Sequence, residues 1–139
     1  MTFRRMRQPT APPVSSDRLG ILLISGTYER AHYAFVTVTA AAALGRDVTI
    51  FATNEGCHAL LADWSGLADA AHDTVLQARG VAGFDTLRAA ATELGIRLIV
   101  CEAGMRATGL ENLPLYENVE IAGVATFLGA TKGGQLLSL

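Results

Sequence analysis

The sequence has few cysteines and few charged side chains, and each scarcity excludes a class of protein. Two cysteines among 139 residues, Cys57 and Cys101, are too few for a disulfide framework. Charged residues make up 17% of the chain and the formal net charge is -2, which gives no overall case for nucleic-acid binding. We therefore predict a reducing, cytoplasmic compartment and no nucleic-acid partner.

Long hydrophobic runs are also missing, although half of the residues are hydrophobic. The uncharged run from Tyr33 to Gly45 falls short of the ~20 residues that a bilayer span needs. No signal-like apolar run follows the N-terminus. We therefore expect a soluble protein with no membrane segment.

Proline is scarce except near the start, where Pro9, Pro12 and Pro13 follow three arginines. Prolines in this setting block helix and sheet, and little else there offsets the entropy of ordering. We predict a flexible tail over residues 1–18 and one domain over residues 19–139. The arginines could alternatively dock on an acidic partner or form an amphipathic targeting stretch.

The remaining chain alternates short apolar runs with helical patterns. Strands are expected near residues 19–26, 48–52, 96–101, 119–122 and 135–139, and helices near residues 29–44, 57–64, 84–94, 103–110 and 124–131. Residues 65–83 look irregular, with a helical turn near 69–77. In the helix over 84–94, Phe84, Leu87, Ala91 and Leu94 share the predicted buried face, whereas Arg88 lies off it. This alternation predicts a three-layer α/β/α sandwich with a mostly parallel five-stranded sheet.

Cys101 is the leading candidate for chemistry because it ends the apolar run Ile96 to Val100. In open α/β sheets the carboxyl ends of the strands form the ligand crevice. A helix start or a nearby cation stabilises a thiolate, and both Gly104 and Arg106 follow closely. The competing interpretation is a small buried hydrophobic residue at a strand end.

Cys57 is a possible second thiol, because it also follows a strand. A redox pair with Cys101 is conceivable, but a packed helix thiol is the favoured interpretation. His58 cannot act as the base for Cys57 by adjacency, because neighbouring helix residues point in different directions.

Other chemistries have little support in the sequence. The stretch Ser25-Gly26-Thr27 lacks the remaining residues of a phosphate-binding loop. The three histidines show no metal-ligand spacing with the cysteines, so we predict no metal site and no cofactor. Glu29, Glu55 and Glu102 follow strands and could line one cleft, although solvated loop carboxylates are the commoner explanation.

The helix over Tyr33 to Leu44 carries no charge on any face. A helix packed only on its own sheet usually keeps a polar stripe for water. We therefore expect a second subunit to cover it, unless its threonines and alanines form a tolerable solvent face.

Four stretches resemble the DsrE/DsrF-like family, and within it the DsrE2-type and DsrE3-type proteins described as predicted peroxiredoxins. They are residues 21–26 with the alanine-rich helix that follows, residues 48–56, residues 101–110 and residues 120–128. The last contains Gly-Val-Ala-Thr-Phe-Leu and is the most specific. The resemblance runs from about Leu19 to Leu139.

The resemblance implies a homotrimer or hexamer whose cysteine, Cys101 here, carries sulfane sulfur as a persulfide. It also implies exchange with a TusA-like carrier protein or a rhodanese-like donor. No peroxidatic motif supports the peroxiredoxin label, and Cys57 matches no cysteine of the family pattern.

We therefore expect a sulfur carrier with sulfurtransferase character, acting in sulfur trafficking or sulfur oxidation. The alternative is an oligomeric small-ligand-binding or scaffold module with a non-catalytic cysteine. A weaker third hypothesis is a thiol peroxidase that uses Cys57 and Cys101 together.

Overall fold

The computed structural model describes residues 17–139, which form a five-stranded sheet in the order β4-β3-β2-β1-β5. The strands are β1 (Arg18–Leu23), β2 (Asp47–Ala52), β3 (Arg97–Cys101), β4 (Val119–Ala122) and β5 (Gln135–Ser138). All four neighbouring pairs are parallel. The predicted α/β class is confirmed, and the sheet is wholly rather than mostly parallel. Of the expected tail, residues 1–16 lie outside the described part of the chain.

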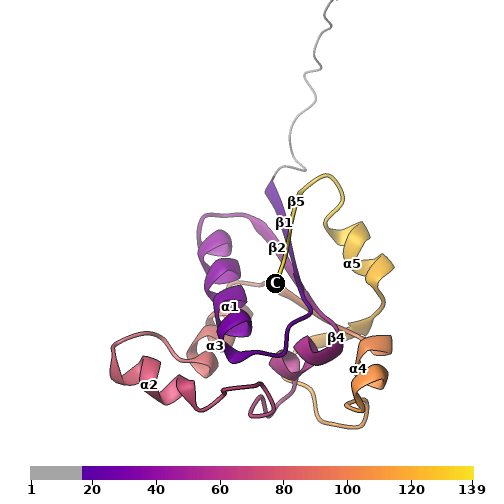
Figure 1. Ribbon diagram of the computed structural model, residues 1–139. Coiled ribbons are helices and arrows are strands. Elements are labelled where there is room, and N and C mark those ends of the chain that lie inside the picture. The colour runs from indigo at the N-terminus through magenta and orange to yellow at the C-terminus, as the bar shows by residue number, and fades with distance from the viewer. Residues whose placement is uncertain (1–16) are drawn as a thin grey trace, which may run out of the picture.

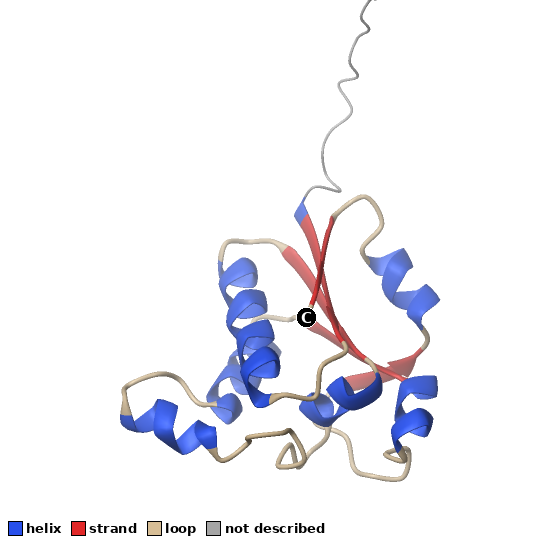
Figure 2. Cartoon of the chain, viewed as in Figure 1, coloured by secondary structure: helices blue, strands red, loops and turns tan. Residues whose placement is uncertain are grey.

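Helices cover the two faces of the sheet and its carboxyl edge. They are α1 (Tyr28–Ala43), the 3-10 helix η2 (Asn54–Leu60), α2 (His72–Ala78), α3 (Phe84–Glu93), α4 (Glu102–Thr108) and α5 (Val124–Ala130). Figure 1 shows α1 and α3 on one side of the sheet, α5 on the other, and α2 projecting beyond α1. Figure 2 shows the strands as the middle layer. Within residues 17–139, no helix is long and apolar enough to cross a membrane.

The two faces of the sheet bury very different amounts of apolar surface. The face under α1 and α3 holds a large cluster that includes Ile21, Phe35 and Leu98. The face under α5 holds a small cluster of Phe51, Ile99, Cys101 and Phe127. Since strand side chains alternate between faces, Ile99 and Cys101 share the α5 side while Leu98 and Val100 face the other.

Arg88 was expected off the buried face of its helix, and that expectation was wrong. Its side chain is almost completely buried, and its guanidinium donates hydrogen bonds to the carbonyls of Ala59 (3.2 Å), Leu61 (2.5 Å) and Ala62 (3.1 Å). It also lies over the Tyr116 ring, 4.0 Å from the centroid. Arg88 thus satisfies carbonyls where η2 ends and fixes the segment that carries Cys57.

Two further expectations needed adjustment at the ends of elements. Leu94 is largely exposed because α3 stops at Glu93 and leaves it as the C-cap. The helix expected over 57–64 is instead the 3-10 helix over Asn54–Leu60. It stops early because Leu61 turns to extended backbone and forms an isolated antiparallel bridge with Leu115.

Candidate functional site

Cys101 is the last residue of β3 and the N-cap of α4. Its neighbour in the sheet is Ala122, the last residue of β4, so the thiol lies at the carboxyl edge as the sequence predicted. The backbone N–H of Gly104 donates a hydrogen bond to Cys101 Sγ over 3.2 Å. The side chain packs with Phe127 of α5, and the residue is 8% exposed. The sulfur is therefore held by a backbone donor close to the surface.

Gly104 is required at its position by a close approach between two turns. A Cβ there would lie 2.4 Å from Thr53 Oγ1 and 2.5 Å from the backbone N of Asn54. The absence of a side chain lets α4 pack against the turn between β2 and η2. Asn54 in that turn has a left-handed backbone with φ of 51°. Thr53 and Asn54 thus form a wall beside the cysteine turn, which sequence analysis did not single out.

Arg106 was expected to stabilise a thiolate, and the structure places its guanidinium on a carboxylate instead. Arg106 Nη2 lies 2.8 Å from Glu102 Oε2, one turn back on the same helix, and both side chains are well exposed. The donor to the sulfur is the Gly104 amide. Arg106 thus has a surface partner of its own.

Cys57 lies within η2 and is completely buried. Its Sγ is 3.7 Å from the carbonyl oxygen of Ala52, which accepts a hydrogen bond from the thiol. Burial, followed by the negative charge of Cys101, raises the pKa of Cys57 to about 12. Cys57 is therefore a protonated thiol at neutral pH, and the two cysteines lie close enough to interact electrostatically.

The remaining candidate groups serve other partners. His58 Nε2 lies 3.5 Å from Glu55 Oε1 and not on the thiol of Cys57. Glu102 pairs with Arg106, so Glu55 and Glu102 each have a local partner. Across residues 17–139, no group of three or more histidine, cysteine or acidic side chains is arranged to hold a metal ion. The chemistry available at this edge is that of a cysteine sulfur and backbone amides.

Comparison with known proteins places this geometry in a family. The model of the DsrE/DsrF-like family matches residues 17–137. The chain belongs to the DsrE/DsrF-like family. It is also 25% identical over 152 residues to the uncharacterized protein YrkE of Bacillus subtilis (strain 168), covering 87% of this chain and 95% of that protein.

A solved structure supports the fold independently. The crystal structure of the ychN protein from E. coli superposes with a TM-score of 0.67 and 16% sequence identity. The match covers 88% of this chain and 98% of that chain. The α/β fold is therefore shared nearly end to end, and membership of the family supports a role related to sulfur relay.

Proposed function

We propose that this protein is a sulfur carrier that accepts sulfane sulfur as a persulfide on Cys101. The observation that carries the proposal is the hydrogen bond from the Gly104 amide to Cys101 Sγ, at the carboxyl edge of a DsrE-like sheet. An N–H donor favours the thiolate over the thiol, because only the anion gains the full strength of a charge-assisted hydrogen bond. The thiolate is the nucleophile that sulfur transfer requires.

Loading is a thiol–disulfide-type exchange. The Cys101 thiolate attacks the outer sulfur of a donor persulfide, the donor's S–S bond breaks, and the donor leaves as a thiolate. The outer sulfur, with its proton, is now bonded to Cys101 Sγ. Unloading runs the same exchange in reverse, with an acceptor thiolate attacking the outer sulfur and Cys101 leaving as the thiolate. No external oxidant or reductant is consumed.

The partner we propose is a small TusA-like carrier protein, with a rhodanese-like protein as an alternative donor. Cys101 is 8% exposed and lies at the surface end of β3, so a partner cysteine must approach along the carboxyl edge of the sheet. A cytoplasmic setting fits this role, because a persulfide carrier needs its acceptor thiols reduced.

A thiol peroxidase that uses both cysteines has less support. Such an enzyme needs Cys57 to attack oxidised Cys101 as a thiolate. Burial and the neighbouring sulfur instead hold Cys57 in its protonated form, and its S–H is directed at the Ala52 carbonyl. We propose that Cys57 is a packing residue.

The decisive experiment is sulfur loading measured by intact mass. The wild-type protein, Cys57→Ser and Cys101→Ser are incubated with polysulfide, and the mass increase of one sulfur atom is quantified. We expect uptake by wild type and by Cys57→Ser, and none by Cys101→Ser. Uptake that persists without Cys101 would overturn the proposal.

The small exposed fraction of Cys101 favours one alternative, a ligand-binding or scaffold module whose cysteine only packs against Phe127. The same experiment separates the two functions. A Cys101 that takes up no sulfur in the folded wild-type protein, and reacts only after unfolding, would establish the packing role.

We also propose that the protein assembles into a homotrimer or hexamer, through the α5 face and not through α1. The hydroxyl groups of Thr37 and Thr39 in α1 donate hydrogen bonds to carbonyls of the same helix, those of Tyr33 and Phe35. The outer surface of α1 can therefore face water without a second subunit. On the α5 side, large apolar side chains are exposed at Val124, Leu128 and Leu136. Val124 and Leu128 lie one turn apart and share one face of the helix.

Light scattering of wild type, Leu128→Asp and Ala40→Asp tests which surface mediates assembly. Loss of the oligomer only in Leu128→Asp supports assembly through the α5 face. Loss only in Ala40→Asp would show that the subunits assemble through α1 instead. A monomeric wild-type protein at micromolar concentration would contradict assembly altogether.

A further inference from the structure

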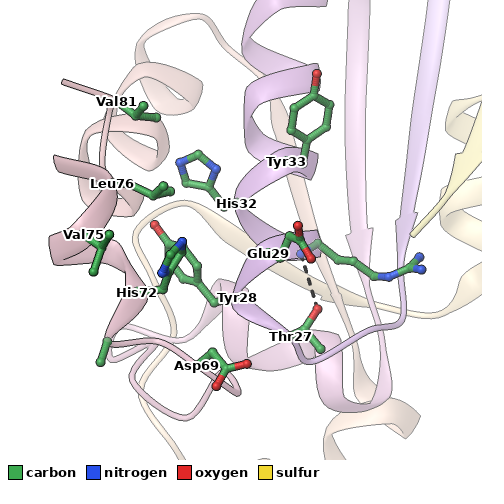
Figure 3. A pocket seen from close by; sticks show the side chains of 12 residues that line it. Thr27, Tyr28, Glu29, His32, Tyr33, Asp69, His72, Val75, Leu76 and Val81 are labelled. Atoms are coloured by element: carbon green, nitrogen blue, oxygen red, sulfur yellow. Dashed lines mark hydrogen bonds between the residues drawn. The ribbon is translucent and has the colours of Figure 1, made fainter. Parts of the chain in front are cut away.

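A cavity of about 870 Å³ lies between the N-terminal half of α1 and the segment that contains α2. Figure 3 shows residues of α1 on one side and residues of α2 and the following loop on the other. Its lining does not include Cys101, Gly104 or Thr53, so it is separate from the proposed sulfur site. Its size is within the range of small-molecule sites, about 300–1,000 Å³.

Apolar groups line opposite walls of this cavity and remain accessible to solvent. Val75, Leu76 and Val81 form one wall, and Tyr33 stands on the α1 side (Figure 3). Val75, Val81 and Tyr33 are all exposed, with Tyr33 at 61%. A ligand with an apolar body would cover these side chains and gain the free energy of their burial.

The cavity is held open by a buried network between its two walls. Tyr28 Oη of α1 donates to Asp73 Oδ1 of α2, and the same carboxylate accepts from the Phe84 amide (2.8 Å) and from Gln77 Nε2 (2.7 Å). Burial opposes the charge of Asp73, but these three donors outweigh it and lower the pKa of the carboxyl group. Asp73 is therefore a carboxylate at neutral pH, and α2 is fixed to α1 without a ligand.

His32 adds an acceptor among the lining residues. The residue is 7% exposed, and its Nε2 lies 2.9 Å from the carbonyl oxygen of Ala82. A carbonyl can only accept, so Nε2 carries the proton of this hydrogen bond. In the neutral ring Nδ1 is then an acceptor.

The charges around the cavity favour a cation. Glu29 and Asp69 line it, Asp73 lies directly behind Tyr28, and Arg30 is the one guanidinium in the lining. Three carboxylates and one guanidinium give a formal charge of -2 when His32 and His72 are neutral. The exposed ring of Tyr33 adds to this preference, because the face of an aromatic ring attracts an ammonium group electrostatically.

We propose that this cavity binds a small organic amine, an ammonium group carried on an aromatic or branched aliphatic body. The ammonium group pairs with the carboxylates of Asp69 and Glu29, and the body packs between Tyr33 and the wall formed by Val75, Leu76 and Val81. This binding is independent of sulfur transfer at Cys101.

The test uses 2-phenylethylamine and two analogues of the same shape, uncharged 2-phenylethanol and anionic 3-phenylpropanoate. Each is titrated into the isotope-labelled full chain, and backbone amide shifts are followed by NMR. We expect saturable shifts with the amine at residues of α1, of α2 and of the segments that flank α2, near Asp69 and Val81. Affinity should be at least about tenfold weaker for the carboxylate. Equal affinity for amine and carboxylate, shifts centred elsewhere, or no saturable binding of the amine would overturn the proposal.

Variants then test the residues. Asp69 has a left-handed backbone with φ of 65°, which asparagine also tolerates, so Asp69→Asn removes the charge without straining the turn. Asp69→Asn and Glu29→Gln should each weaken amine binding about three- to tenfold. The matched control Glu93→Gln removes an exposed carboxylate at the end of α3 and should change nothing.

Two further variants test whether the ligand contacts the apolar wall and whether amine binding is independent of Cys101. Val75→Ser should weaken binding of the amine and of 2-phenylethanol alike, because it removes apolar contact and no charge. Cys101→Ser should bind the amine like wild type, so that failure of sulfur loading and failure of amine binding stay distinguishable. Unchanged affinity in Asp69→Asn, Glu29→Gln and Val75→Ser together would contradict the assignment.

Discussion

Cys57 and Cys101 lie near the carboxyl ends of two neighbouring strands, β2 and β3, yet their sulfur atoms have opposite backbone partners. The thiol of Cys57 donates to a carbonyl, that of Ala52, and the residue has no exposed surface. The sulfur of Cys101 accepts from an amide, that of Gly104, and the residue is 8% exposed. A carbonyl partner favours the protonated form and an amide partner favours the anion. Burial is the largest cause of the raised pKa of Cys57, and the different backbone partners of the two sulfur atoms act in the same direction.

The largest expected difference between the two cysteines is their rate of alkylation. In Cys101→Ser the remaining Cys57 is buried, and burial, the largest cause of its raised pKa, leaves very little thiolate at pH 7.5. In Cys57→Ser the remaining Cys101 keeps an exposed fraction of 8% at the carboxyl end of β3. We expect iodoacetamide to modify Cys101 at least about 100-fold faster in the native proteins, as measured by mass spectrometry. Alkylation rates of Cys57 and Cys101 that differ by less than threefold would show that the two thiols are equally reactive.

The second prediction concerns the stability of the protein at high pH. The folded-state pKa of Cys57 is raised from 9.0 to about 12, so the unfolded chain loses this proton first. The protonated Cys57 thiol therefore contributes to the free energy of unfolding, and this contribution is fully present below pH 9 and is lost as pH rises from 9 toward 12. Its full size is on the order of 2–4 kcal/mol, since each unit of pKa corresponds to about 1.4 kcal/mol.

The measurement is urea unfolding at pH 8, 9 and 10 for wild type and Cys57→Ala. The wild-type free energy of unfolding should fall more steeply with pH than that of the variant. Burial and Asp73 also raise the pKa of Tyr28, so the variant keeps part of the slope above pH 10. Parallel curves for the two proteins up to pH 10 would show that Cys57 ionises equally in both states.

The third prediction tests the close approach that brings the amide to Cys101. Gly104→Ala places a methyl group against the backbone of Asn54 and the hydroxyl of Thr53, and should cost about 1–3 kcal/mol of stability. The displaced amide should also slow alkylation of Cys101. Gly129→Ala is the matched control, because a Cβ there meets nothing within 4 Å in α5. Equal stability of the two variants would show that α4 can shift at no cost.

Sequence patterns predicted the parts of this molecule that depend on local periodicity. The apolar run ending at Cys101 sufficed to place that thiol at the carboxyl edge, because parallel strands end together there. Arg88 could not be predicted as buried, because its partners are carbonyls at the end of η2 and just beyond it, nearly thirty positions away in the sequence. No sequence pattern identifies those carbonyls as its partners. The wall formed by Thr53 and Asn54 and the cavity beside α2 depend on tertiary contacts between separate turns. The role expected of Arg106 rested on its position in the sequence alone, which cannot show that its guanidinium pairs with Glu102.

The smallest expected effect is that of replacing Arg106. This variant removes the other group that could stabilise a Cys101 thiolate, so it tests whether the Gly104 amide alone distinguishes Cys101 from Cys57. The guanidinium lies 2.8 Å from Glu102 in an exposed pair, and such pairs contribute about 0–1 kcal/mol to stability. We expect Arg106→Gln to alter the alkylation rate of Cys101 less than about twofold, because an exposed charge paired with a carboxylate exerts little net field on the sulfur. Glu102→Gln is the matched variant, since it releases the guanidinium, and it should speed alkylation slightly if Arg106 can then reach Sγ. A tenfold slower reaction in Arg106→Gln would mean that the side chain leaves Glu102 during the reaction, and that Cys101 depends on a cation as well as on the Gly104 amide.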